Sequence, residues 1–229
     1  MILTYKGESL EKHIKGMLMA WNSLSTRYNL MLGYRLKTLL DNKEPPLSAD
    51  RTMRAMIILH DVGKCIPLYQ EFVQRGMDLG GYRHEIVSAY IAQRWLSQGE
   101  IREHYKILVT LSVLLTHEAI LFNRLERARL HSFTGCIEGM IFKESETEIL
   151  AEAKEIICGF MKNEAGLECK LPHVIERKEV CEQIERFVGS VQGVFGDFMH
   201  KLRISYTPFL MLLKQCDYKA ASERVRCKV

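Results

Sequence analysis

Several features that define common classes of protein are missing from this sequence. The longest strongly apolar run, Ile107 to Leu115, is far shorter than the roughly 20 residues of a membrane-spanning helix, and it indicates a buried helix instead. The N-terminus has no basic stretch followed by an apolar run and a small-residue cleavage site, so no secretory signal is expected. These absences predict a cytoplasmic protein that does not enter the membrane.

The cysteines also lack a pairing pattern. There are 7 of them, an odd number, and none forms a Cys-x-x-Cys pair that would suggest a zinc or redox site. Reduced, mostly structural thiols are therefore expected. A Gly-x-x-x-x-Gly-Lys-Ser/Thr motif is absent too, so the chain should carry no ATP-driven motor of its own.

Alternating runs of β-branched and polar residues are not found, nor is any fixed-period repeat. The 229 residues, 47% hydrophobic and 26% charged, are enough for one domain with a substantial core. We therefore expect a single all-α domain over residues 1–229. The net charge of +4 permits attraction to polyanions but does not establish nucleic-acid binding.

Apolar residues recur at helical spacing along most of the chain. Ser9 can cap a first helix that carries His13, and Ser48 or Asp50 can cap a second helix that ends near His60-Asp61, before Gly63 and Pro67. Further helices are expected over residues 82–97, 100–117, 121–130, 146–161 and 176–224, with Pro208 marking a break or kink in the last range. Several large apolar side chains in these patterns should fill the core: Met53, Met56, Met199, Met211, Trp21 and Trp95.

The residues that suggest chemistry surround His60-Asp61. A His-Asp pair is a weak signal alone, but here it begins HDVGK (60–64) after an apolar helix, with His13 upstream. Three further segments follow in order: YRHE (82–85), LTHE (115–118) and CDYKAASE (216–223).

In this order, the segments resemble the HD nucleases of type I CRISPR systems, and the resemblance covers residues 9–223. It implies the all-α helical fold of the HD superfamily. It also implies that His13, His60, Asp61 and Asp217 surround one metal ion, and that Asp61, His84 and His117 hold a second, with Asp61 bridging the two. Many family members carry two consecutive histidines where this chain has His117-Glu118, which leaves the role of Glu118 open.

Such a donor set has a clear chemical use. Imidazole nitrogen and carboxylate oxygen suit manganese, iron, cobalt or nickel, whereas an oxygen-rich site would favour magnesium. Two divalent ions about 3.5–4 Å apart can activate a water and neutralise charge on a phosphodiester. Asp61 and Lys64 are the candidate catalytic residues, and Lys64 and Arg83 are candidates for binding the substrate phosphate.

Each of these residues also has an ordinary interpretation. His13 alone would be a polar-face histidine, Asp217 could be a solvated residue between lysines, and Lys64 and Arg83 could be surface charges. The shared order of the motifs favours the site. The other histidines match no position in the resemblance and are expected to be structural or exposed: His104, His131, His173 and His200.

The resemblance implies a nuclease that degrades DNA, preferentially single-stranded, alongside a separate CRISPR helicase and an RNA-guided effector complex. One alternative is an HD phosphohydrolase acting on nucleotides or cyclic dinucleotides, because the same metal cage serves any phosphate ester. Another is a non-enzymatic scaffold, which the Glu118 departure motivates.

Overall fold

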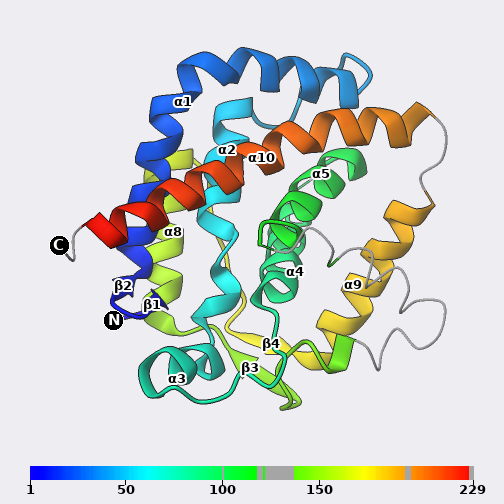
Figure 1. Ribbon diagram of the computed structural model, residues 1–229. Coiled ribbons are helices and arrows are strands. Elements are labelled where there is room, and N and C mark those ends of the chain that lie inside the picture. The colour runs from blue at the N-terminus through cyan, green and yellow to red at the C-terminus, as the bar shows by residue number, and fades with distance from the viewer. Residues whose placement is uncertain (100, 118–120, 122–136, 194–196, 227–229) are drawn as a thin grey trace.

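Helices dominate the architecture, as the sequence predicts (Figure 1). The computed structural model describes residues 1–99, 101–117, 121, 137–193 and 197–226. The principal helices are α1 (Leu10–Leu39), α2 (Ala49–Leu59), α3 (Pro67–Arg75), α4 (His84–Leu96), α5 (Glu103–Leu114), α8 (Ala151–Ala165), α9 (Arg177–Gln192) and α10 (Asp197–Arg226). A short 3-10 helix, η1 (Val62–Cys65), follows α2.

Both predicted helix caps near the site are present. The Ser9 side chain accepts a hydrogen bond from the Lys12 amide at 3.2 Å, and Ser48 accepts one from the Arg51 amide at 3.3 Å. Ser48 is therefore the cap of α2, and Asp50 instead accepts a hydrogen bond from the Trp21 indole at 2.8 Å.

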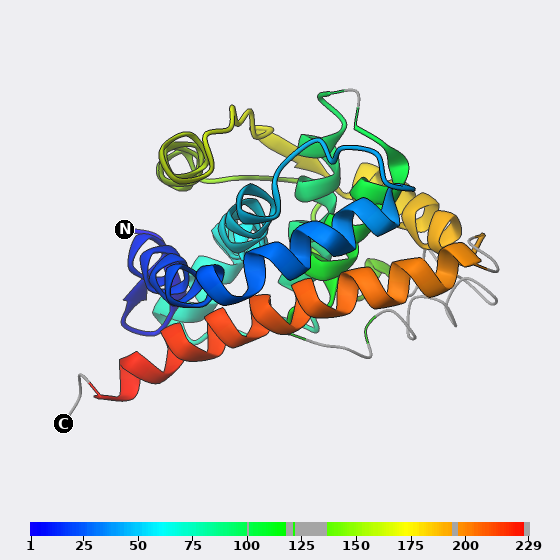
Figure 2. The same ribbon diagram turned by 90° about the horizontal axis from the view of Figure 1, so that it is seen from above.

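Helix α1 turns near its middle, so that its two halves serve different parts of the molecule (Figure 1). At the turn, the Ser23 hydroxyl donates to the carbonyl of Ala20 at 2.7 Å, and Ser25 donates to Asn22 at 3.1 Å. Hydroxyls that bond to backbone carbonyls of the preceding turn often bend helices. The first half carries His13, and the second half continues beside α10 (Figure 2).

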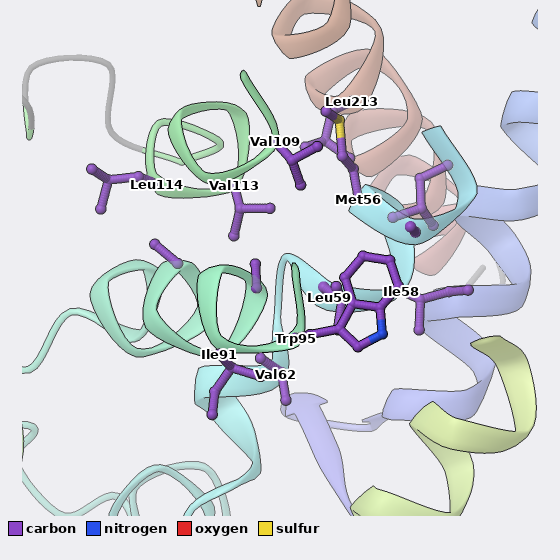
Figure 3. Close-up of a cluster of buried hydrophobic side chains, with 14 of the residues drawn as sticks. Met56, Ile58, Leu59, Val62, Ile91, Trp95, Val109, Val113, Leu114 and Leu213 are labelled. Atoms are coloured by element: carbon purple, nitrogen blue, oxygen red, sulfur yellow. The ribbon is translucent and has the colours of Figure 1, made fainter. Parts of the chain in front are cut away.

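The core is continuous beneath the helices that lead to the site. Figure 3 shows side chains of α2, η1, α4, α5 and α10 meeting in one cluster that includes Met56, Trp95, Val109 and Leu213, all buried. The predicted core positions Met53, Met56, Trp21 and Trp95 are confirmed. The prediction is wrong for Met211, which is 60% exposed, and the side chain of Met199 lies outside the described residues.

Two antiparallel ribbons complete the fold: β1 (Leu3–Tyr5) pairs with β2 (Glu8–Ser9), and β3 (Glu146–Glu148) pairs with β4 (Val174–Glu176). The helix expected from residue 146 therefore begins later, at Ala151. Residues 146–148 are extended because they pair with a segment far along the chain, and Ile175 of that segment is fully buried. A local apolar pattern cannot reveal such pairing.

The sequence predicts a break or kink at Pro208, and the structure shows no break there. Helix α9 ends at Gln192, whereas α10 runs through Pro208. An internal proline costs about 3 kcal/mol, but residues on both sides of this one pack against the core: Ser205, Phe209 and Leu213 are buried. Packing along α1 therefore keeps one long helix.

Other boundaries differ by a few residues. Helix α5 ends at Leu114, so that His117 follows the helix instead of ending it. Pro67 occupies the first turn of α3, a helix that the sequence reading did not predict, because proline suits that position as well as it stops a helix. The helix expected at 121–130 lies almost entirely outside the described residues.

The thiols of Cys65, Cys158, Cys169, Cys181 and Cys216 are free, as expected for the cysteines in the described ranges. Within the same ranges, the longer helices are too polar to cross a bilayer.

Candidate metal centre

The six predicted donors converge from distant parts of the chain. They are supplied by α1, the end of α2, the start of α4, the segment after α5, and α10: His13, His60, Asp61, His84, His117 and Asp217. Two overlapping groups could each hold an ion: His13, His60 and Asp217, and His60, Asp61 and His117. In each group the donor atoms lie within 4.8 Å of one another.

Asp61 is at the centre of this arrangement. Its Oδ2 lies 3.5 Å from Nε2 of His13 and 3.4 Å from Nε2 of His60. Its Oδ1 lies 3.3 Å from Nε2 of His84 and 3.1 Å from Nε2 of His117. The two carboxylate oxygens thus face two different pairs of histidines, which is the geometry that a bridging carboxylate requires.

Asp217 contacts two histidines on the side of the cluster nearest to solvent. One of its oxygens is 3.4 Å from Nε2 of His13, and the other is 3.5 Å from Nδ1 of His117. The side chains of Asp217 and His117 are 22% and 24% exposed, whereas Asp61 is only 1% exposed. The centre therefore opens to solvent at Asp217 and His117.

The donor set fits a divalent ion. Nε2 of His60 and Nε2 of His84 are buried and make no hydrogen bond to any residue that the structure describes. Leaving a buried nitrogen without a partner costs about 1–3 kcal/mol, so such atoms call for an electron-pair acceptor. A metal ion near Asp61 would supply one.

The opposite ring nitrogen of three histidines faces a fixed oxygen. Nδ1 of His60 is 2.7 Å from the carbonyl of Ile57. Nδ1 of His13 is 3.3 Å from Glu8, and Nδ1 of His84 is 3.4 Å from Glu85. A proton on Nδ1 leaves the lone pair of Nε2 directed at the centre, as in many carboxylate–histidine–metal arrangements.

The sequence reading missed the two buried glutamates. Glu85 lies within the RHE segment and could have been noticed there. Glu8 gives no signal by spacing, because it lies on β2 and not on the helix that carries His13. Only the folded hairpin brings Glu8 to the ring.

The N-terminal hairpin is fastened to the HDVGK segment by Gln70. The amide of this buried side chain donates 2.8 Å bonds to the carbonyls of Leu3 and Lys64, and its oxygen accepts from the Leu3 amide at 2.9 Å. On the hairpin, the Thr4 hydroxyl donates to Glu8 at 3.2 Å. This network fixes the carboxylate that faces His13.

We expect Glu8→Gln to weaken manganese binding by about 10- to 100-fold, because a neutral amide supports the His13 imidazole less well than a carboxylate. Isothermal titration calorimetry on the full chain measures the effect directly. Glu11→Gln is the matched control, since Glu11 is exposed and pairs with Lys15 at 2.6 Å. Equal manganese affinity in Glu8→Gln and Glu11→Gln would contradict the supporting role of Glu8.

Gly63 lets α4 approach the HDVGK segment. A Cβ atom at residue 63 would overlap the carbonyl oxygen of His84. The Gly63 amide donates to the Ser88 hydroxyl at 2.9 Å, and the Tyr82 hydroxyl donates to the Gly63 carbonyl at 2.6 Å. This close packing places His84 beside Asp61.

The protonation states suit metal binding. Burial lowers the pKa of His60 to about 4, so its ring is neutral near pH 7. Burial would raise the pKa of Asp61, but the neighbouring charges of His60 and Lys64 and a hydrogen bond from His117 outweigh it and hold this pKa well below its usual range. The centre therefore combines an ionised carboxylate with a neutral imidazole.

Lys64 and Arg83 occupy different positions relative to the centre. Lys64 lies within the centre: its side chain is 11% exposed, and its ammonium lies 2.7 Å from Asp61. Arg83 is half-buried and precedes α4, where its amide donates to the carbonyl of Met140 at 2.7 Å.

Glu118 lies outside the described residues. Of the excluded histidines, His173 is exposed and lies near Lys154 and Glu148.

Comparisons with known proteins extend these observations, although no family model matches the chain. It is 30% identical over 232 residues to a CRISPR-associated endonuclease Cas3-HD of Pyrococcus furiosus, covering 96% of this chain and 91% of the relative. It is 28% identical over 231 residues to the corresponding protein of Methanocaldococcus jannaschii, covering 97% and 89%.

The fold is also similar to that of a solved structure, the CRISPR-associated Cas3 HD domain protein of Methanocaldococcus jannaschii. The TM-score is 0.67 at 20% identity, and the match covers 93% of this chain and 100% of that one. At this identity the likeness concerns the fold alone.

Proposed function

Because the chain belongs to the CRISPR-associated Cas3-HD endonucleases, we propose that it degrades DNA, preferentially single-stranded, as a single HD domain spanning residues 1–229. The chain is a metal-dependent HD nuclease, a hydrolase of phosphodiester bonds. One observation carries the proposal: four imidazole Nε2 atoms surround the two oxygens of Asp61.

Two divalent ions are part of this proposal. His13, His60, Asp61 and Asp217 would hold one, and Asp61, His84 and His117 would hold the other. The number of imidazoles favours manganese, iron, cobalt or nickel over magnesium. When bound, such ions supply Lewis acidity and an activated water for phosphodiester hydrolysis.

The chain's own residues would bind and orient the substrate. Lys64 holds its ammonium 2.7 Å from Asp61, within reach of a phosphate at the centre. Arg83, next to His84 in sequence, would offer its guanidinium to the same phosphate or its neighbour. Both contacts recognise the backbone and carry no base specificity.

Single-stranded DNA is favoured because the centre needs an accessible backbone more than a particular base. Target choice would therefore come from elsewhere, namely an RNA-guided effector complex, and strand separation from a distinct helicase. Cytoplasmic location belongs to the same proposal.

Cleavage of a labelled single-stranded oligonucleotide should require manganese or a similar ion and should stop when EDTA removes it. The same strand annealed to its complement should be cut at least about tenfold more slowly, because base pairing restricts access to the backbone. The sequence of the strand is the same in both substrates. Gel electrophoresis of the products measures both effects.

Two results would redirect the assignment. If the protein hydrolysed cyclic dinucleotides but left single-stranded DNA uncut, the phosphohydrolase alternative would be favoured. A purified chain that binds no metal by mass-spectrometric analysis would favour the scaffold.

A further inference from the structure

A groove of about 460 Å³ lies between the second half of α1 and α10, which run side by side in Figure 2. It is lined by Tyr28, Met31, Pro208, Met211, Leu212, Lys214, Gln215 and Tyr218. The lining contains two aromatic rings and an ammonium, and none of these eight residues is acidic. Met211 and Tyr218 are 60% and 75% exposed, so the groove carries apolar surface that the fold leaves in solvent.

The cations at this groove suit a polyanion. Lys214 lines it directly, and Arg27, which lies outside the lining, holds its guanidinium 5.2 Å from the centroid of the Tyr28 ring. Flat rings beside cations are the combination that proteins use to bind single-stranded nucleic acid, where bases stack on aromatic faces and phosphates meet positive charge.

Two residues that line the groove, Lys214 and Tyr218, flank Asp217 on α10. Asp217, which faces His13, directly precedes Tyr218 and follows Lys214 by about one turn of α10. At 3.6 residues per turn, Lys214 and Tyr218 project roughly 60° and 100° from Asp217, both toward the same side of the helix. A strand leaving the centre at Asp217 would therefore cross these two residues before it enters the groove.

We propose that the α1–α10 groove, with Lys214 and Tyr218 at its entrance, binds the single-stranded DNA next to the phosphate that is cleaved. This inference rests on the proposed function and adds a binding subsite to it. Tyr218 and Tyr28 stack against unpaired bases, and Lys214 pairs with the adjoining phosphate. A duplex keeps its bases stacked inside, so this subsite favours single strands.

Fluorescence anisotropy with a labelled oligothymidylate in EDTA, which prevents cleavage, tests the subsite on the full chain. Tyr218→Ala should weaken binding by about 5- to 150-fold, whereas Tyr218→Phe, which keeps the ring, should bind like the wild type. Lys214→Gln should weaken binding and reduce the salt slope by about 0.7. Manganese titration of each variant checks that Asp217 has not been displaced.

Tyr34→Ala and Lys178→Gln are the matched controls, because Tyr34 is 66% exposed on α1 outside the groove lining and Lys178 is 87% exposed on α9. Normal binding by Tyr218→Ala and Lys214→Gln, with a wild-type chain that cleaves single strands, would overturn the subsite alone. An equal loss in Tyr34→Ala would overturn it as well. A wild type that neither binds nor cleaves single strands would defeat the proposed function too.

Discussion

Replacing Asp61 with asparagine should reduce the cleavage of single-stranded DNA by about a thousandfold or more. Asp61 places one oxygen toward His13 and His60 and the other toward His84 and His117. Asparagine offers one neutral oxygen and turns an NH₂ group toward two of these imidazoles. The loss of several kcal/mol of charge stabilisation corresponds to this factor, at about 1.36 kcal/mol for each tenfold change in rate.

Initial rates under saturating manganese measure the effect, and circular dichroism shows whether the variant folds. Asp78→Asn is the matched control: Asp78 is exposed and accepts a hydrogen bond from the Gly80 amide at 3.0 Å, which asparagine can also accept. A folded Asp61→Asn variant with a rate close to that of Asp78→Asn would refute the assigned centre.

Gly63→Ala should lower the melting temperature by on the order of 10 °C. The new methyl group would meet the His84 carbonyl, and overpacking of this kind typically costs 1–3 kcal/mol or more. For a chain of this size, each kcal/mol shifts the midpoint by roughly 2–4 °C. Any relief of the clash also moves α4, so His84 should leave its position beside Asp61 and cleavage should fall.

Differential scanning calorimetry and the DNA cleavage assay follow the two consequences separately. Gly159→Ala is the appropriate comparison, because a Cβ at this position of α8 meets no atom within 4 Å. Alanine in an open helical position should stabilise the protein by up to about 1 kcal/mol. If Gly63→Ala melted at or above the temperature of Gly159→Ala, the close approach of α4 would not matter.

The sequence was sufficient to predict which donors meet, although it could not give their surroundings. The donor roles of His13, His60 and Asp61 were implied by the resemblance of the motif order to the HD nucleases, whereas the helix caps, which are local, predicted only the helices that carry or precede them. Glu8 could not be predicted, because its contact with His13 depends on a hairpin that Gln70 holds in place. The metal roles of these residues remain predictions.

Two errors in the predicted fold share a physical origin, because tertiary contacts outweighed local preferences. The pairing of β3 with β4 joins residues 146–148 to residues 174–176, and no local periodicity encodes it. Pro208 stays helical because packing of α10 outweighs a local preference. The error at Met211 arises differently. Its helical pattern indicated burial, but no part of the described structure covers this side of α10, which lines an open groove.

The candidate metal donors span the chain from His13 to Asp217, so the complete set exists only after folding brings α1, α2, α4 and α10 together. An ion that binds this set binds the native state far better than the unfolded chain, and occupancy is thereby linked thermodynamically to folding. At a free ion concentration 1,000 times the dissociation constant, the native state gains about 4.1 kcal/mol. We therefore expect that removing divalent ions would lower the stability of this protein as well as its rate of cleavage.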